Sequence, residues 1–548
     1  MRQLTRRTML AGAGATALAP MSALRSFAAP APCLRSLKDF RAEARTQELN
    51  GQQRELLVKQ AIEVLQGIYV HLPLKRSLYG IDPLNELRTL LPQAQQFNSD
   101  PPFHAKMMDI FISLRDMHTR YRPPAPYTTG HAFLPFKVET CVEQGQRKFI
   151  VSKVAEGFTH PTFRAGVEVL SWNGVPIWQA AENAGGEGGV PSARHALGLA
   201  RLTYRALQLQ PIPEEDSVLV HYRSNGNELD VEVPWQVLTQ TDPCRGTCNE
   251  IQQIQEFRKF LYAPYFFCSA FGTSDRFSTP DGEFGYIRIF SFDKALFNDD
   301  DGVFVEMFKN TAGSFADTRG LIVDVRDNGG GSSRAGERIV QWVAPTPGPI
   351  EPSQLYFVAT DLTLRLCQLG NSVSDLGPNG LTPWIPSIQQ ALKSSKTFSD
   401  AFEYTRKSDC SVAGRVPFPR PVIVVTSGLT YSSAEFFAAG FQDHGGKILG
   451  VDETTGGGGA GVRDLRQLNK YFSDAHQPLP YEDVATKANG AGFQVAFRRT
   501  KRVGLGAGKE LEDTGVKRDL SYDMTRDDLL FGNRDLKVAA ARLLAQMN

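Results

Sequence analysis

Residues 421–437 of the chain have the sequence PVIVVTSGLTYSSAEFF. The apolar, β-branched run at 421–426 predicts a buried strand of a parallel sheet, and the apolar spacing after Glu435 predicts a helix packed on that sheet. Ser432 then stands at the turn between strand and helix, where free backbone N–H groups and the helix dipole would stabilise an oxyanion. The simpler alternative is that Ser432 and Ser433 only cap the helix.

A second informative segment is GLIVDVRDNGGG, residues 320–331. An apolar run that ends in Asn328 and three glycines predicts a strand followed by a tight turn, in which other groups can approach the backbone N–H groups. A predicted strand at 284–290 and a predicted helix at 304–315 precede it. Strand, helix and strand in this order predict a right-handed crossover and parallel pairing.

Together these segments resemble the serine peptidase family that includes the tail-specific (C-terminal processing), tricorn core and CPAF-like proteases. In that family a strand ending in D-x-R-x-N-G-G-G is followed by a turn of the S-x-x-E type and a helix ending near D-x-G. The corresponding residues here are 324–331, 432–435 and 443–445. The resemblance implies an α/β fold with a ClpP/crotonase-like ββα catalytic core.

The branch of the family matters for the catalytic residues. Members with a Ser–Lys dyad would have their lysine within the glycine run 456–459, most closely at Gly457, so the base of that dyad is missing. The tricorn and CPAF-like branch uses Ser, His and Glu instead, with the His in a D-x-H-T motif and the Glu before a G-V-x-P-D-like segment. Residues 116–119 (DMHT) and 512–519 (EDTGVKRD) resemble these motifs, although Met117 replaces the Ser of some relatives and Arg518 replaces the proline.

The resemblance therefore implies a catalytic set of Ser432 as nucleophile, His118 as base and Glu512 as the carboxylate that orients the base. A serine hydroxyl needs such a base, and imidazole is well suited to that role near neutral pH. The backbone N–H of Ser433, with that of Gly329 or Gly330, would hold the oxyanion.

Without the family pattern, plainer alternatives exist for these residues. His118 would be a core or helix-end histidine, and Glu512 a solvated loop carboxylate. Two other residues compete as bases: His444, alternatively a surface residue at a helix end, and Lys447, alternatively a simple C-terminal helix charge.

Composition limits the classes of partner. The 548 residues are 41% hydrophobic and 22% charged, as expected for a globular chain of several domains. With 60 basic and 59 acidic side chains there is no electrostatic case for nucleic acid as a partner. No internal apolar stretch approaches the roughly 18 residues of a membrane helix, so no integral membrane segment is expected in the mature chain. The basic run RRTKR at 498–502 predicts a solvated hairpin edge or, alternatively, a guide for acidic substrate segments.

The N-terminus predicts export. Residues 5–10, TRRTML, form a twin-arginine pattern, and an apolar region rich in Ala and Gly follows. We expect a Tat signal peptide at 1–28, cleaved after Ala28, and hence a periplasmic or secreted protein. Beyond it we expect a helical domain that carries His118 (29–127), a PDZ-like domain (128–240), a linker (241–280) and the peptidase domain (281–548).

The PDZ-like assignment depends on residues 166–174, GVEVLSWNG, which resemble the G-D-x-I-x-x-x-N-G hallmark with Val167 in place of the aspartate. A PDZ groove would bind a peptide by adding it as a strand. Alternatively, this domain is a structural remnant.

The seven cysteines are Cys33, Cys141, Cys244, Cys248, Cys268, Cys367 and Cys410. In an oxidising compartment, Cys244 with Cys248 and Cys367 with Cys410 are possible bridges. The chain has no C-x-x-C pair and no H-E-x-x-H helix, and we expect neither a metal nor a cofactor.

These patterns favour an exported serine endopeptidase that hydrolyses polypeptides by a Ser-His-Glu mechanism. One alternative is a catalytically degenerate PDZ scaffold that binds peptides or envelope partners. Another is a different serine hydrolase, since Ser291 and Lys294 form an S-x-x-K match, but no companion K-T-G or S-D-N triplet is present.

Overall fold

The computed structural model describes residues 34–44, 49–155, 157–239, 271–370, 380–473 and 490–547. The expected export signal, four of the seven cysteines (Cys33, Cys244, Cys248 and Cys268) and most of the expected linker lie outside the described residues.

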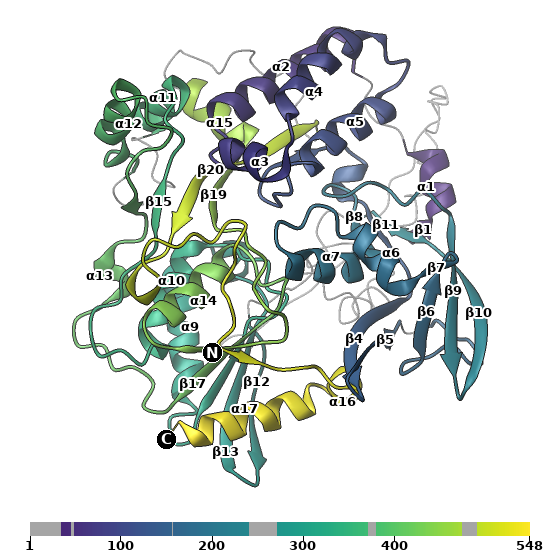
Figure 1. Cartoon of the computed structure of the whole chain (residues 1–548), viewed down its shortest axis with the longest axis vertical. Helices are drawn as coiled ribbons and strands as arrows, with labels where there is room; N and C mark the ends of the chain where they lie inside the picture. The colour runs from purple at the N-terminus through teal and green to yellow at the C-terminus, as the bar shows by residue number, and fades with distance from the viewer. Residues whose placement is uncertain are drawn as a thin grey trace, which may run out of the picture. The chain divides into compact units, whose positions relative to one another are not determined.

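A six-stranded sheet carries the two segments on which the sequence analysis rests (Figure 1). Its strands, in spatial order, are β12 (Phe271–Thr279), β13 (Gly282–Ile289), β14 (Leu321–Asp324), β17 (Val422–Thr426), β18 (Lys447–Gly450) and β21 (Leu520–Ser521). β12 pairs antiparallel with β13, and every later pair is parallel. Helix α9 (Asp301–Gly313) connects β13 to β14, so the expected crossover with parallel pairing is confirmed.

Both faces of this sheet are buried, which explains the continuous apolar runs of β14 and β17. Val323 and Val424 share a core with α9, α10 (Ser333–Val343) and α14 (Ser433–Asp443). Ile322 and Ile423 share a second core with α17 (Arg534–Gln546). Alternate side chains of one strand thus serve opposite layers.

A second, antiparallel sheet shares its core with the N-terminal helices, since Leu57, Phe111 and Phe493 belong to one apolar cluster. Its strands are β16 (Phe402–Glu403), β15 (Gln354–Tyr356), β20 (Gly492–Lys501) and β19 (Ala460–Asp464), with β2 (Arg120–Arg122) also paired to β20. The helices around it are α2 (Gly51–Gly67), α3 (Leu72–Tyr79), α4 (Pro83–Leu90), η1 (Leu91–Gln96), α5 (Asp100–Ile112), α11 (Asp361–Gly370), α12 (Trp384–Lys393) and α15 (Leu465–Ser473).

The PDZ-like region contains two antiparallel sheets over one apolar core. The larger has the order β10 (Asn227–Pro234), β9 (Ser217–Ser224), β6 (Glu168–Trp172), β5 (Gln146–Val154) and β4 (Phe136–Glu143), with β7 (Val175–Pro176) on β6. The smaller consists of β1 (Leu34–Ser36), β11 (Gln236–Leu238), β3 (His131–Phe133) and β8 (Tyr204–Ala206). Helices α1 (Leu37–Glu43), α6 (Ile177–Ala184) and α7 (Pro191–Thr203) complete it.

The C-terminal tail forms two helices, α16 (Arg526–Leu530) and α17, because Gly532 and Asn533 take positive φ between them. One of the two possible disulfide bridges is ruled out. Cys367 and Cys410 are both free and belong to different apolar cores, so they do not form a bridge. Within the described residues, no helix has the length and apolar character needed to span a bilayer.

Candidate active site

Ser432 occupies a strained turn at the end of β17. Its φ of 57° and ψ of −126° lie in a region that non-glycine residues rarely adopt, and α14 begins at the next residue. The Ser432 side chain makes no capping hydrogen bond, so Ser432 does not serve as a side-chain cap of the helix. The Ser432 carbonyl accepts from the N–H groups of Glu435 and Phe436, which fixes the turn to the first turn of the helix.

The glycine loop after β14 packs directly against this turn. Asn328 accepts from the Tyr431 N–H with its carbonyl (2.9 Å) and from the Gly330 N–H with its Oδ1 (2.9 Å). A Cβ on Gly330 would lie 2.5 Å from the Ser432 Cβ, and Gly330 itself has a φ of 102°. Only glycine fits there. Because the Gly330 N–H is engaged by Asn328, Gly329 is the better placed of the two expected loop donors for an oxyanion.

Ser432 and His118 line one cavity of about 680 Å³, together with Gly329, Gly331 and Tyr431. The ring centroids of His118 and Tyr431 lie 4.7 Å apart. Among the described residues, Ser432 and His118 are not joined by a hydrogen bond, so this is an open arrangement rather than a closed catalytic pair.

His118 is buried, and its nearest charged partner is Asp116. The Asp116 Oδ1 accepts from the His118 backbone N–H (2.7 Å). Burial lowers the pKa of His118 to about 4, and the Asp116 charge opposes this shift. Burial raises the pKa of Asp116, but His71, Lys75 and His118 outweigh it and hold that pKa at about 2. At neutral pH, therefore, the imidazole is neutral beside an ionised carboxylate.

Glu512 is buried in a cluster of charged groups rather than solvated in a loop. Its Oε1 lies 2.8 Å from the Lys75 Nζ, which also contacts Asp513 Oδ1 (2.5 Å). Burial raises the pKa of Glu512, and the Lys75 ammonium is the strongest charge opposing that rise. Glu512 has no hydrogen bond or ion pair to His118 in the part of the chain that the structure describes.

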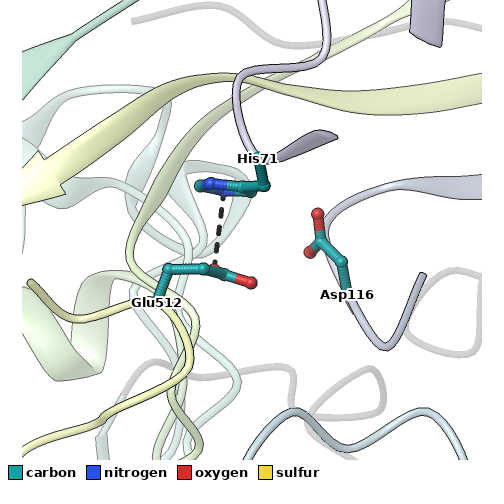
Figure 2. Close-up of side chains that lie close together, drawn as sticks. All are labelled: His71, Asp116 and Glu512. Carbon is teal, nitrogen blue, oxygen red and sulfur yellow. Dashed lines mark ion pairs between the residues drawn. The ribbon is translucent and has the colours of Figure 1, made fainter. Parts of the chain in front are cut away.

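Figure 2 shows Glu512 with His71 and Asp116. The ligand atoms of these three residues lie within 4.8 Å of one another, a spacing that metal ligands can adopt. However, Arg499 Nη1 lies 3.1 Å from His71 Nδ1, and a guanidinium can only donate. Burial lowers the pKa of His71 well below its ordinary value, so the neutral ring carries its proton on Nε2, 3.6 Å from Glu512 Oε2. This donor set fits a hydrogen-bonded charge cluster better than a metal centre.

The glycine run at 456–459, where a dyad lysine would stand, is held by Glu435. The Gly457 and Gly458 N–H groups donate to the Glu435 carboxylate at 2.8 and 2.6 Å. A Cβ on Gly458 would overlap the Tyr431 ring, at 1.7 Å from its Cζ. This buried loop thus supports Tyr431, which in turn contacts His118.

The competing bases are otherwise engaged. His444 is buried rather than a surface residue, with Nδ1 bonded to the Gly440 carbonyl (2.7 Å) and Nε2 to the Glu351 N–H (3.0 Å). Lys447 is half exposed and pairs with Asp519 at 3.3 Å. Ser291 of the S-x-x-K match is buried, and its hydroxyl supports the glycine loop through the Gly330 carbonyl (3.3 Å).

The sequence analysis missed His71 and Lys75. Neither lies in a recognisable motif, and their partners Arg499, Glu512 and Asp513 are more than 400 residues away along the chain. Spacing along the sequence holds no signal for such a cluster.

Comparisons with known proteins agree with this fold. Residues 283–519 match the model of peptidase family S41, and residues 130–243 match a PDZ domain model. A search of curated proteins gave no match.

Among solved structures, mature CPAF has a TM-score of 0.64 and 16% identity, over 90% of this chain and 97% of that chain. CPAF complexed with lactacystin gives a TM-score of 0.63 at 16% identity, over 91% and 99%. The photosystem II D1 C-terminal processing protease has a TM-score of 0.36 and 16% identity, over 86% and 93%. The chain is a serine-type peptidase, and its residues 283–519 match the model of peptidase family S41.

Proposed function

We propose that this chain is an exported endopeptidase in which Ser432 attacks the peptide carbonyl, His118 accepts the serine proton and Glu512 stabilises the imidazolium that forms. The observation that carries the proposal is the strained Ser432 turn, whose hydroxyl is not used as a cap and which lines one cavity with the neutral His118. The Ser433 and Gly329 N–H groups would bind the oxyanion, with Gly330 contributing only if it leaves Asn328.

In this scheme, the proton taken by His118 passes to the leaving amine, and water then hydrolyses the acyl-enzyme by the same route in reverse. Asp116 is the carboxylate that acts most strongly on His118, while Glu512 would act from the neighbouring charge cluster. The imidazolium would thus form beside the ionised Asp116 in a buried environment, where charge stabilisation is strong.

Labelling with a fluorophosphonate tests the assignment. We expect the wild-type chain to label, Ser432→Ala to lose labelling entirely, and His118→Ala to lose nearly as much, because such residues act as a unit. Ser291→Ala is the matched control, since its hydroxyl supports the loop without lining the cavity. Equal labelling of wild type and Ser432→Ala would refute the nucleophile, and a folded wild type that binds peptides without labelling would identify the degenerate scaffold.

The export part of the proposal rests on the twin-arginine pattern at 5–10. Changing both Arg6 and Arg7 to Lys should leave unprocessed chain in the cytoplasm. Processed protein beginning near Ala29 outside the cytoplasm, in that double variant, would contradict the twin-arginine route.

A further inference from the structure

The basic run at 498–502 is not a solvated hairpin edge. Arg498, Arg499 and Arg502 are 2%, 4% and 6% exposed, respectively. The first two lie on β20, which has β15 and β19 as its neighbours and is therefore an interior strand. Three buried guanidinium groups require partners, because an unpaired buried charge is costly.

Two of the three arginines have carboxylate partners. Arg499 pairs with Glu510, and Arg502 pairs with Asp443 through both Nε and Nη2. Arg498 differs: in the described part of the chain it has no ion pair with a carboxylate, and its Nε and Nη1 have no hydrogen-bond partner. Its guanidinium instead lies 4.4 Å from the ring centroid of Tyr404 and 4.7 Å from that of Phe497.

Within the described residues, Arg498 therefore has no carboxylate to balance its charge, although Tyr404 is a hydrogen-bond partner. Burial lowers the pKa of Arg498 to about 10, and the Arg463 charge adds to this effect. Aromatic rings compensate only part of the desolvation of a guanidinium. A carboxylate is the group that would satisfy both the charge and the unused N–H donors.

Arg498 also lines the cavity that contains Ser432 and His118. Among the described residues, the cationic residues of the cavity wall are Arg120, Arg122, Arg201, Lys294, Arg463 and Arg498, and Asp327 is the one acidic residue that lines it. Buried Glu187 pairs with Arg120 and Arg201. Gly461, another lining residue, lies directly against Arg498, because a Cβ there would lie 2.8 Å from the Arg498 Nε.

We propose that Arg498 is the centre of an anion-binding subsite in the active-site cavity, which takes an acidic side chain of the polypeptide substrate. This inference rests on the proposed function in one respect, namely that the bound polypeptide is cleaved at Ser432. The free C-terminal carboxylate of a peptide has the same chemistry as an acidic side chain, and the experiment below distinguishes the two.

The test uses the full chain and quenched fluorescent peptides built around the bond it cleaves fastest in denatured casein. At each position, Glu is compared with Gln, which has the same shape without the charge. At the best position, kcat/KM for Glu should exceed that for Gln on the order of ten- to a hundredfold, the effect of one hydrogen bond to a charged group. Arg498→Met should reduce this ratio to about one, while Lys501→Met, which removes a charge from the same strand outside the cavity, should keep it.

The affinity of the Ser432→Ala variant for the same peptides, measured by fluorescence anisotropy, gives the ratio of binding of Glu and Gln peptides without catalysis. This measurement can therefore be interpreted even if the assignment of Ser432 as nucleophile is wrong. If Arg498→Met does not fold, Arg498→Lys keeps the charge but loses the planar set of N–H donors and should lower the ratio. Equal use of Glu and Gln by the wild type, or a ratio that survives Arg498→Met, would overturn the proposal. A preference for a free C-terminus over its amide, without any effect of Glu, would also overturn it in favour of chain-end recognition.

Discussion

The two sides of the candidate active-site cavity are held together by different forces. On the side of the proposed nucleophile (the nucleophile side), backbone hydrogen bonds and the close approach of Gly330 to Ser432 join the β17–α14 turn to the loop after β14. On the side of the proposed base (the base side), Lys75 and Arg499 pair with buried or half-buried carboxylates and so join the start of α3, the segment 115–118 and the segment 510–513.

This difference predicts what each side tolerates. The nucleophile side has no room for added volume, because its contacts are between backbone atoms and a glycine. The base side has no tolerance for unbalanced charge, because its carboxylates are desolvated and depend on one ammonium and one guanidinium.

Among the changes that leave Ser432 and His118 in place, the largest effect on labelling should come from Gly330→Ala. The new Cβ would lie 2.5 Å from the Ser432 Cβ and 2.8 Å from the Ser433 N, at a backbone φ of 102°. Strain and overpacking together should cost about 2–5 kcal/mol in the free energy of unfolding. Because Ser432 and an oxyanion donor would both shift, fluorophosphonate labelling should fall on the order of a hundredfold. Gly348→Ala, whose nearest neighbour is 3.7 Å away, is the matched control. Labelling at the wild-type rate would show that the turn accommodates volume after all.

Lys75→Met should follow, with a loss of about 3–5 kcal/mol in the free energy of unfolding, the usual effect of removing one partner of a buried ion pair. Denaturant unfolding measures it. Lys106→Met is the control, since both Lys106 and its partner Glu86 are more than 40% exposed at 3.9 Å, and it should cost about 0–1 kcal/mol.

A double variant sharpens this result. Adding Glu512→Gln to Lys75→Met removes the unpaired carboxylate, so the double variant should be more stable than Lys75→Met alone. Equal or greater loss in the double variant would mean that Lys75 serves Asp513 and not Glu512.

The nucleophile side could be predicted from the sequence because each of its parts is local. Five consecutive buried residues in β17 and a glycine loop after β14 leave periodic and compositional signals, and the parallel pairing of β13, β14 and β17 follows from the crossover. Even so, the positive φ of Ser432 depends on the packing of Gly330, which only the tertiary structure shows.

The base side could be predicted only in part. The D-x-H-T motif drew attention to His118, which lines the cavity with Ser432, but nothing in the local sequence marks His71 or Lys75, which meet Glu512 and Asp513 only in the folded chain. The burial of the basic run at 498–502 could not be predicted from the local sequence either. Its charge suggested an exposed segment, whereas β20 is an interior strand of its sheet and three of the arginines are buried.

A smaller effect concerns pH. Burial lowers the pKa of His118 to about 4, so the ring stays neutral and able to accept a proton until the pH falls through about 4, rather than about 6.5 as for an exposed histidine. The rate of fluorophosphonate labelling should therefore be nearly constant from pH 8 to 5 and fall below that. Asp116→Asn removes the charge that raises this pKa and should move the midpoint lower. A midpoint near 6.5 in the wild type would contradict a buried His118 as the base.

The smallest effect should be that of Lys447→Ala. Its side chain is 54% exposed and its ammonium pairs with Asp519 at 3.3 Å, a surface contact that contributes about 0–1 kcal/mol. Lys447 does not line the cavity that holds Ser432, and the glycine loop held by Glu435 occupies the place of a dyad lysine. Labelling rate and unfolding free energy should both stay close to wild type, measured beside His118→Ala in the same assay. If Lys447→Ala abolished labelling while His118→Ala did not, the base would be a lysine. The charge cluster of Lys75, Arg499 and Glu512 would then have only a structural role.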